Sequence, residues 1–449
     1  MAAAVLMLWF AGMNTKGADQ VSFARDVAPI LVHKCTTCHN REKRKGGYEV
    51  ETFEAFLRAG ESKEAPVVAG DPHKSKVFQL LTAKDEDDRM PQKSEPLPPG
   101  QIELIERWIR GGAVFDGGQS NLPLHALISS AHPDPPEAYP HAVPIRALAF
   151  NADGAEIAVG GYHEITFWRC EDGKLQRRIK NIAQQVLGIA YAPNGRLLAV
   201  ASGTPGKIGQ LNLVDPAENT AGKVLGTARD AMLAVCFNPA GDRLAAGAAD
   251  NSIRVYAVES GEQELLIEQH ADWVLGLSFN SDGSLLASAS RDKTARLFDA
   301  KNGELENTYV GHNDAVFAVV FDPEGKRVLS AGRDKSLHVW DVKEAKKLEE
   351  VKGFDDEVFR LVVSSNSVFS CGADKKVRQH SLAKKPELVR TFSGHEDVVY
   401  AIAYHEASGR LASGSFDGEV RIWDVSDGKV VRSFVAAPGM SAVRSARAN

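Results

Sequence analysis

One short motif in this chain combines residue types that can hold a metal-containing cofactor. Residues 35–39 read Cys-Thr-Thr-Cys-His, which places two thiols and one imidazole close together in the chain. This spacing is typical of c-type haem attachment, in which the thiols of Cys35 and Cys38 bond to the haem vinyl groups and His39 binds the iron. The motif therefore predicts one covalently attached haem.

Zinc binding and thiol redox chemistry also use paired cysteines. A structural zinc site would need a second pair of ligands at suitable spacing, and the sequence has no other Cys or Cys-His cluster. A thioredoxin-like pair would follow a strand, but the residues before Cys35, DVAPILVHK, are helix-like. The remaining cysteines lie in or beside strand-like segments and are expected to pack as small apolar side chains: Cys170, Cys236 and Cys371.

Helical periodicity surrounds the motif. Apolar residues fall on one face of a predicted helix before it, namely Phe23, Val27, Ile30 and Leu31. A second predicted helix carries Ile102, Ile105, Trp108 and Ile109. That helix follows Pro-Pro-Gly at 98–100 and runs into Gly-Gly at 111–112, which are sensible start and stop signals. Residues 21–117 are thus expected to form a small α-helical domain.

Three segments of this region resemble the planctomycete-type cytochrome c domain: VSFARDVAPILVHKCTTCHN, DRMPQ and LPPGQIELIERWIRGGAVF. In that family a helix leads into the haem motif and a Met-Pro segment supplies the distal ligand. The resemblance implies that Cys35 and Cys38 bind the porphyrin covalently. It further implies that His39 is the proximal ligand of the haem iron and Met90 the distal ligand.

The residues alone leave the sixth iron ligand open. Met90 is the only methionine between the haem motif and the end of this region, and Pro91 stiffens its loop. A methionine can instead simply fill a core. His73 would give a bis-imidazole haem of lower potential, whereas His33 lies too close to the motif to reach round the ring easily.

Methionine and histidine ligation would occupy both axial positions of the iron, so electron transfer is expected rather than substrate turnover. A cluster of basic residues surrounds the motif: Lys34, Arg41, Lys43, Arg44 and Lys45. This cluster either steers an acidic redox partner or is a solvated face with no partner.

A repeat of about 40 residues occupies most of the remaining chain. Three close copies begin at His270, His312 and His395. Weaker copies begin near Val143, Val186, Leu233 and Val358, which brings the count to seven. Each copy has short apolar runs separated by turn residues, the pattern of antiparallel strands that make one propeller blade. The expected fold class is therefore α plus all-β, with a helical cytochrome c domain followed by a seven-bladed β-propeller at residues 141–439.

The repeats resemble the WD-repeat family through Gly-His pairs at 311–312 and 394–395 and Trp-Asp pairs at 340–341 and 423–424. The resemblance implies hydrogen-bonded sets inside single blades. The two strongest sets are His312, Ser330, Asp334 and Trp340, and His395, Ser413, Asp417 and Trp423. A third set has His270, Ser288 and Asp292, with Phe298 in place of the Trp. Because the same trio recurs at the same spacing, it favours a structural device over a catalytic triad.

The ends of the chain and the segment between the two regions have their own patterns. Residues 1–20 resemble an export segment: the apolar run at 2–13 has the length of a signal-peptide core and is too short to span a bilayer. No Lys or Arg precedes this run, so either the start is atypical or the true start lies upstream. Residues 118–140 are a Pro-rich linker or an ordered strap, and 440–449 form a tail.

Composition limits the class of partner. The net charge of −6 gives no reason to expect nucleic acid, and no later segment is apolar enough to be an integral membrane span. Attachment of c-type haem is, by family resemblance, a process of the periplasmic side of bacterial membranes. We therefore expect a periplasmic or otherwise extracytoplasmic monohaem electron carrier whose propeller docks a partner protein. The alternatives are a haem-dependent oxidoreductase with a substrate site on the propeller face and a mainly structural interaction scaffold.

Overall fold

The structure is a computed structural model. It describes residues 21–36, 38–40, 43–92, 95–116, 120, 124, 132–218 and 220–440, without the side chains of Arg25 and His33. The predicted export segment and residues 441–449 of the tail lie outside the described residues. The chain divides into two compact units, residues 1–130 and 131–449. No helix in the described part is long and apolar enough to cross a membrane.

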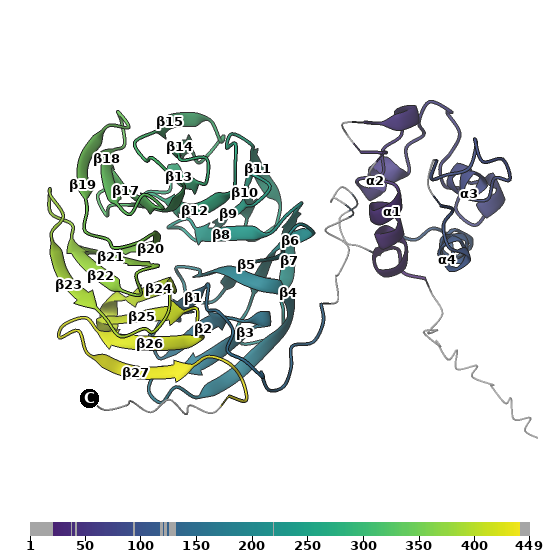
Figure 1. The fold of residues 1–449 in the computed structure, drawn as a ribbon. Coiled ribbons are helices and arrows are strands. Elements are labelled where there is room, and N and C mark those ends of the chain that lie inside the picture. The colour runs from purple at the N-terminus through teal and green to yellow at the C-terminus, as the bar shows by residue number, and fades with distance from the viewer. Residues whose placement is uncertain are drawn as a thin grey trace, which may run out of the picture. The chain divides into compact units, whose positions relative to one another are not determined.

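Short helices make up the first unit (Figure 1). They are η1 (Phe23–Val27), α1 (Ala28–Lys34), η2 (Lys45–Gly47), α2 (Phe53–Phe56), η3 (Pro72–Lys74), α3 (Lys76–Leu81) and α4 (Pro99–Arg110). Pro99 lies in the first turn of α4, where its missing N–H costs no helical hydrogen bond. The helix ends at Gly111, and Gly112 follows with a φ of 95°, which glycine adopts without steric cost. Both predicted helices of this region are therefore present.

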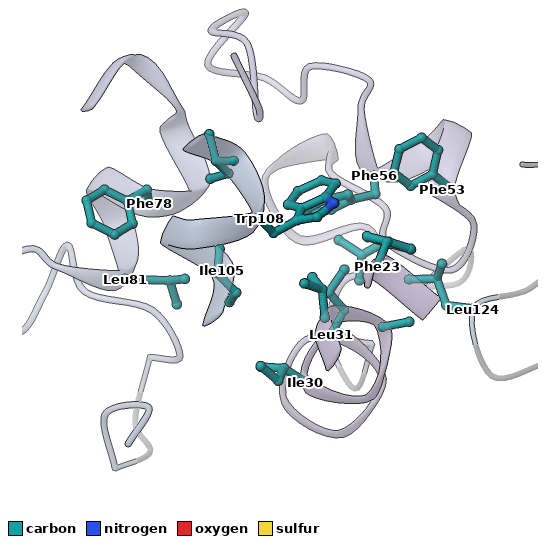
Figure 2. Packing of buried hydrophobic residues seen from close by; sticks show 14 of the residues in the cluster. Phe23, Ile30, Leu31, Phe53, Phe56, Phe78, Leu81, Ile105, Trp108 and Leu124 are labelled. Carbon is teal, nitrogen blue, oxygen red and sulfur yellow. The ribbon is translucent and has the colours of Figure 1, made fainter. Parts of the chain in front are cut away.

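One apolar cluster holds these helices together (Figure 2). The Phe23 ring of η1 lies 4.7 Å from the Phe53 ring of α2 and 5.1 Å from the Trp108 ring of α4. All three side chains are buried, and each such burial contributes about 1.5–3 kcal/mol. The Trp108 indole N–H also donates to Val114 O at 2.9 Å. The helical segment that leads into the Cys-x-x-Cys-His motif is thus anchored on both α2 and α4.

The second unit consists of antiparallel strands, in one seven-stranded sheet and five four-stranded sheets (Figure 1). The strands are β1 (Leu148–Phe150), β2 (Glu156–Gly160), β3 (Tyr162–Arg169), β4 (Leu175–Tyr191), β5 (Leu198–Thr204), β6 (Ile208–Val214), β7 (Lys223–Ala228), β8 (Met232–Phe237), β9 (Arg243–Ala248), β10 (Ile253–Ala257), β11 (Gln263–Ile267), β12 (Val274–Phe279), β13 (Leu285–Ser290), β14 (Ala295–Asp299), β15 (Leu305–Tyr309), β16 (Val316–Phe321), β17 (Arg327–Gly332), β18 (Leu337–Asp341), β19 (Lys347–Val351), β20 (Val358–Val363), β21 (Ser367–Gly372), β22 (Val377–Ser381), β23 (Leu388–Phe392), β24 (Val399–His405), β25 (Arg410–Ser415), β26 (Glu419–Asp424) and β27 (Val430–Val435), with a short helix η4 (Glu406–Ser408) after β24.

The first sheet departs from the expectation of separate four-stranded blades. Residues 175–180 of β4 pair with β3, and residues 185–191 of the same strand pair with β5. Between these pairings Asn181 has a φ of 63°, yet the chain continues as one strand from Leu175 to Tyr191. The first two repeats therefore share one sheet instead of forming two.

The inner strands of the repeats contact one another in a closed series. We use this term for β1, β4, β8, β12, β16, β20 and β24. Each contacts the next in chain order, and β24 contacts β1. Figure 1 shows β8, β12, β20 and β24 around a common centre. Strands that are far apart in the sequence, such as β1 and β24, are thereby brought side by side.

The chain segment just before β1 is ordered against the strands. The Tyr139 hydroxyl donates to the Glu164 carboxylate at 2.6 Å, and the Tyr139 backbone N–H donates to Pro438 O at 2.9 Å. The Arg178 guanidinium donates to Pro136 O at 2.7 Å. Residues 132–140 are thus a strap on the second unit. The last sheet is completed by its own strand, β27, which pairs with β26.

Candidate haem site

The Cys-x-x-Cys-His motif continues the turn that α1 begins. The backbone N–H of Cys35 donates to Leu31 O at 2.8 Å, which extends the pattern of α1 by one residue. The backbone N–H groups of Cys38 and His39 then both donate to Cys35 O, at 3.2 and 3.0 Å. The two thiols and the imidazole are therefore held on one tight turn whose orientation is set by α1.

The Cys35 thiol lies in an apolar environment. Its side chain packs against the apolar cluster of the helical unit, and neither Cys35 nor Cys38 is in a disulfide. Burial, with a smaller contribution from Cys38, raises the pKa of Cys35 to about 12. Cys35 is therefore a neutral thiol at neutral pH in the metal-free chain.

His39 is placed between two backbone segments. Its carbonyl oxygen accepts from the Val50 N–H at 2.8 Å, and its ring lies 5.5 Å from the Tyr48 ring in an edge-on arrangement. The Tyr48 hydroxyl donates to Phe56 O at 2.7 Å, which fixes that ring against α2. Sequence analysis did not single out Tyr48, because no spacing rule connects it to the motif.

The His39 ring has a buried nitrogen, Nδ1, that lacks a hydrogen-bond partner among the described residues. A buried polar atom without a partner costs about 1–3 kcal/mol, so each such atom calls for an explanation. Here it belongs to the one imidazole of a motif that also presents two uncommitted thiols. This donor set fits a covalently bound haem.

Met90 lies in the loop that follows α3. Its backbone N–H donates to Leu80 O at 3.0 Å, which ties the loop to that helix. The side chain is partly buried but is not among the described side chains that pack against the apolar cluster. This position argues against a purely core-filling role. Ligation of the iron by Met90 stays a prediction.

The other predicted residues of this region are placed as follows. His73 is exposed, with its ring 5.8 Å from the Phe78 ring. His33 belongs to α1, but its side chain is outside the described set. The basic residues described near the motif are all exposed: Lys34, Lys43, Arg44 and Lys45. Arg44 forms an ion pair with Glu49 at 3.0 Å, and Arg41 lies outside the described residues.

In the strand unit, the set around His312 forms as predicted. His312 Nδ1 lies 2.7 Å from the Asp334 carboxylate, and His312 Nε2 lies 2.7 Å from the Ser330 hydroxyl. The Trp340 indole N–H donates to the same hydroxyl at 3.1 Å. All four residues come from one sheet and its turn, so they brace that sheet from within.

The set around His270 repeats this arrangement without the Trp. His270 Nδ1 lies 2.8 Å from the Asp292 carboxylate and Nε2 lies 2.7 Å from the Ser288 hydroxyl, while Phe298 supplies no donor. Burial by itself raises the pKa of Asp292, but hydrogen bonds from His270 and Thr294 outweigh it and hold that pKa below its usual range. Asp292 is therefore ionised at neutral pH.

The set around His395 differs from the prediction. Ser413 does bond to His395 Nε2 at 2.7 Å and accepts from the Trp423 indole at 2.8 Å. However, the carboxylate nearest to His395 Nδ1 is that of Glu419, at 3.4 Å, while Asp417 accepts from the Glu419 backbone N–H. The expected pairing of His395 with Asp417 is therefore wrong.

Two groups in the described residues bring enough His and acidic side chains together to hold a metal ion. They are His312, Asp334 and His338, and His395, Asp417 and Glu419. Each group lies within a single sheet and overlaps one of the hydrogen-bonded sets. Neither resembles the convergence of loops from several sheets that a catalytic site on the strand unit would need.

Comparison with known proteins identifies both regions. The family model described as Planctomycete cytochrome C matches residues 35–94. The model described as WD domain, G-beta repeat matches residues 222–257, 261–299, 303–341 and 386–424. A probable serine/threonine-protein kinase, PkwA, of Thermomonospora curvata is 43% identical over 60 residues. Those residues are 13% of this chain and only 8% of the kinase.

A cytochrome c domain implies haem binding, and WD repeats imply protein interaction. The chain therefore joins a planctomycete cytochrome C domain to a series of WD repeats, as the two resemblances predicted.

Proposed function

We propose that this protein is an exported monohaem c-type cytochrome that transfers electrons and uses its strand unit to dock a partner protein. The observation that carries the proposal is the turn at residues 35–39. There, two free thiols lie beside a histidine whose buried Nδ1 has no partner among the described residues.

Each residue of the site has a distinct role in this proposal. Cys35 and Cys38 form the two thioether bonds, His39 supplies the proximal nitrogen and Met90 the distal sulfur. A haem held by these residues would supply one-electron redox chemistry. The apolar cluster around Cys35 keeps water from one side of the motif, and the hydrogen bond between His39 O and Val50 N holds the imidazole in place.

The docking platform is proposed to be a seven-bladed propeller. Support comes from the closed series of inner strands, in which β4 provides the last strand of one repeat and the first strand of the next. On this interpretation the wide first sheet counts as two blades. A propeller presents loops from all blades on one face, a common arrangement for binding proteins.

Export to the periplasm is proposed because c-type haem attachment takes place there by family resemblance. The apolar run at residues 2–13 is consistent with it. The acidic redox partner proposed from the basic residues near the motif would meet an exposed, positively charged surface.

The test is expression of the full chain in a host competent for cytochrome c maturation. We expect mass spectrometry to find one haem added covalently, and the oxidised spectrum to show a low-spin haem with a methionine-to-iron band. Cys35→Ala together with Cys38→Ala should abolish covalent attachment, whereas Cys236→Ala should leave it intact. Absence of covalent haem in the wild type would refute the proposal. High-spin iron that binds small ligands would instead indicate the oxidoreductase.

A further inference from the structure

The inner strands carry bulges at equivalent places. In each pairing with the neighbouring strand one residue is skipped, and these residues are Leu187, Leu233, Leu275, Phe317, Phe359 and Tyr400. Arg146 has the equivalent sequence position just before β1. We call these seven side chains the rim residues. Aromatic contacts link them across sheets, with ring distances of 5.4 Å from Phe317 to Phe359 and 5.0 Å from Phe359 to Tyr400.

The position after each rim residue is small in every repeat except one. It is occupied by Ala147, Gly188, Ala234, Gly276, Ala318 and Ala401, all of them buried. The reason is close approach, because a Cβ on Gly276 would lie 3.0 Å from Phe317 O of the next inner strand. In β20 the same position is Arg360.

Arg360 extends across the ring of inner strands. Its Nη1 donates to Leu275 O at 3.0 Å and its Nη2 donates to Leu187 O at 3.2 Å. These carbonyls belong to β12 and β4, which are not neighbours of β20 in the closed series. The guanidinium therefore lies inside the ring, at the level of the rim residues.

No carboxylate balances this charge in the part of the chain that the structure describes. The two hydrogen bonds of Arg360 go to backbone carbonyls. Arg360 forms no ion pair with an acidic residue among the described residues. Burial lowers the pKa of Arg360, and the neighbouring Cys371 thiol opposes this only in part. A guanidinium has five N–H donors, so several are left for another acceptor. Arg146 adds a second cation on the rim, 5.4 Å from the Tyr400 ring.

We propose that Arg360 binds the carboxylate of an acidic peptide segment of a partner protein, seated on the rim residues. Guanidinium and carboxylate form paired, charge-assisted hydrogen bonds, and the aromatic rim residues suit an apolar residue next to the acid. Phe416 is 45% exposed with its ring 6.1 Å from that of Tyr400, so the apolar surface continues beyond the rim. The choice of a peptide rests on the proposed docking role of the strand unit.

The experiment titrates the full, haem-loaded chain with a blocked dipeptide, acetyl-phenylalanyl-aspartyl amide, followed by ligand-detected NMR. The asparaginyl dipeptide, equal in shape but uncharged, is the ligand control. We expect the aspartyl form to bind at least about tenfold more tightly. Arg360→Ala should remove this difference. Arg291→Ala, which deletes an exposed arginine stacked 4.8 Å over the Trp273 ring, should leave it unchanged.

Arg360→Ala is expected to fold, because Ala318 and Ala401 hold the equivalent positions. If it does not, Phe359→Leu copies the rim residue Leu275 and should weaken binding of the aspartyl dipeptide severalfold. Equal binding of both dipeptides, or no binding of either at millimolar concentration, would overturn the proposal. Acetate binding as tightly as the aspartyl dipeptide would also overturn it, because the site would then hold small anions only. Since haem spectra are recorded on the same sample, failure here is distinguishable from failure of haem attachment.

Discussion

Removal of the Ser330 hydroxyl should destabilise the strand unit by breaking two buried hydrogen bonds at once. Because the ionised Asp334 accepts from His312 Nδ1–H, the other ring nitrogen accepts from Ser330, and Ser330 accepts from the Trp340 indole. Ser330→Ala leaves the indole donor and the ring nitrogen without partners in a buried place. At about 1–3 kcal/mol for each of the two orphaned groups, we expect a loss of roughly 2–6 kcal/mol of unfolding free energy.

Two other serines at the same strand position serve as internal comparisons, because their hydroxyls form fewer hydrogen bonds than that of Ser330. Ser288 bonds only to His270, because Phe298 has replaced the tryptophan, so Ser288→Ala orphans one group and should cost about 1–3 kcal/mol. The buried Ser370 hydroxyl has no partner among the described residues, since Phe354 stands where the three close repeats have His270, His312 and His395. Ser370→Ala should therefore be neutral or slightly stabilising.

Urea unfolding of the full chain, followed by far-ultraviolet circular dichroism, measures all three variants. The expected order of loss is Ser330→Ala, then Ser288→Ala, then Ser370→Ala, with unchanged dependence on urea concentration. Equal losses in the three variants would refute the reasoning, because the effect would then come from the strand position and not from the hydrogen bonds. A loss of about 2 kcal/mol in Ser370→Ala would refute it as well.

Three further outcomes are expected. Met90→His should remove the methionine-to-iron band and lower the reduction potential in a redox titration, because imidazole is the stronger donor to ferric iron. Asp292→Asn should cost stability at neutral pH, because the pKa of Asp292 is lower in the folded than in the unfolded state. The difference from wild type should begin to shrink as the pH falls below about 4 and should vanish only below the lowered pKa of the folded state. Tyr139→Phe removes the hydrogen bond to the buried Glu164 and should speed hydrogen exchange in residues 132–140, at a cost of about 1–2 kcal/mol.

Each of these variants has a matched control. Met440→Ala should leave the haem spectrum unchanged, and a change there would mean that the spectrum reports general damage. Asp417→Asn should cost less stability than Asp292→Asn at neutral pH, because Asp417 accepts from the Glu419 backbone N–H and forms no bond with His395 among the described residues. Tyr162→Phe, which removes an exposed bond with Gln184, should leave hydrogen exchange in the strap as it is. An Asp292→Asn difference that does not shrink as the pH falls below about 4 would contradict the assignment of that group.

The sequence alone was sufficient to predict those features that depend on the spacing of residues close together in the chain. The Cys35 to His39 motif, the helix that precedes it and the helix from Pro99 are encoded within a few turns of chain, so periodicity and capping residues identify them. The repeats were visible for a related reason, because one unit of sequence is one unit of structure. The hydrogen-bonded set around His312 followed from the resemblance of these repeats to the WD-repeat family.

Other features were decided only by the tertiary structure. They depend on contacts between segments that are distant in the chain, or on which of two neighbouring carboxylates lies beside a given side chain. His395 has an Asp at the same interval as His312, yet Glu419 places its own carboxylate beside the ring, where Thr294 or Ser336 stands in the other repeats. The sharing of β4 depends on the pairing of its two halves with β3 and with β5. The reach of Arg360 to β12 and β4 depends on closure of the strand series, which brings together residues that no sequence interval relates.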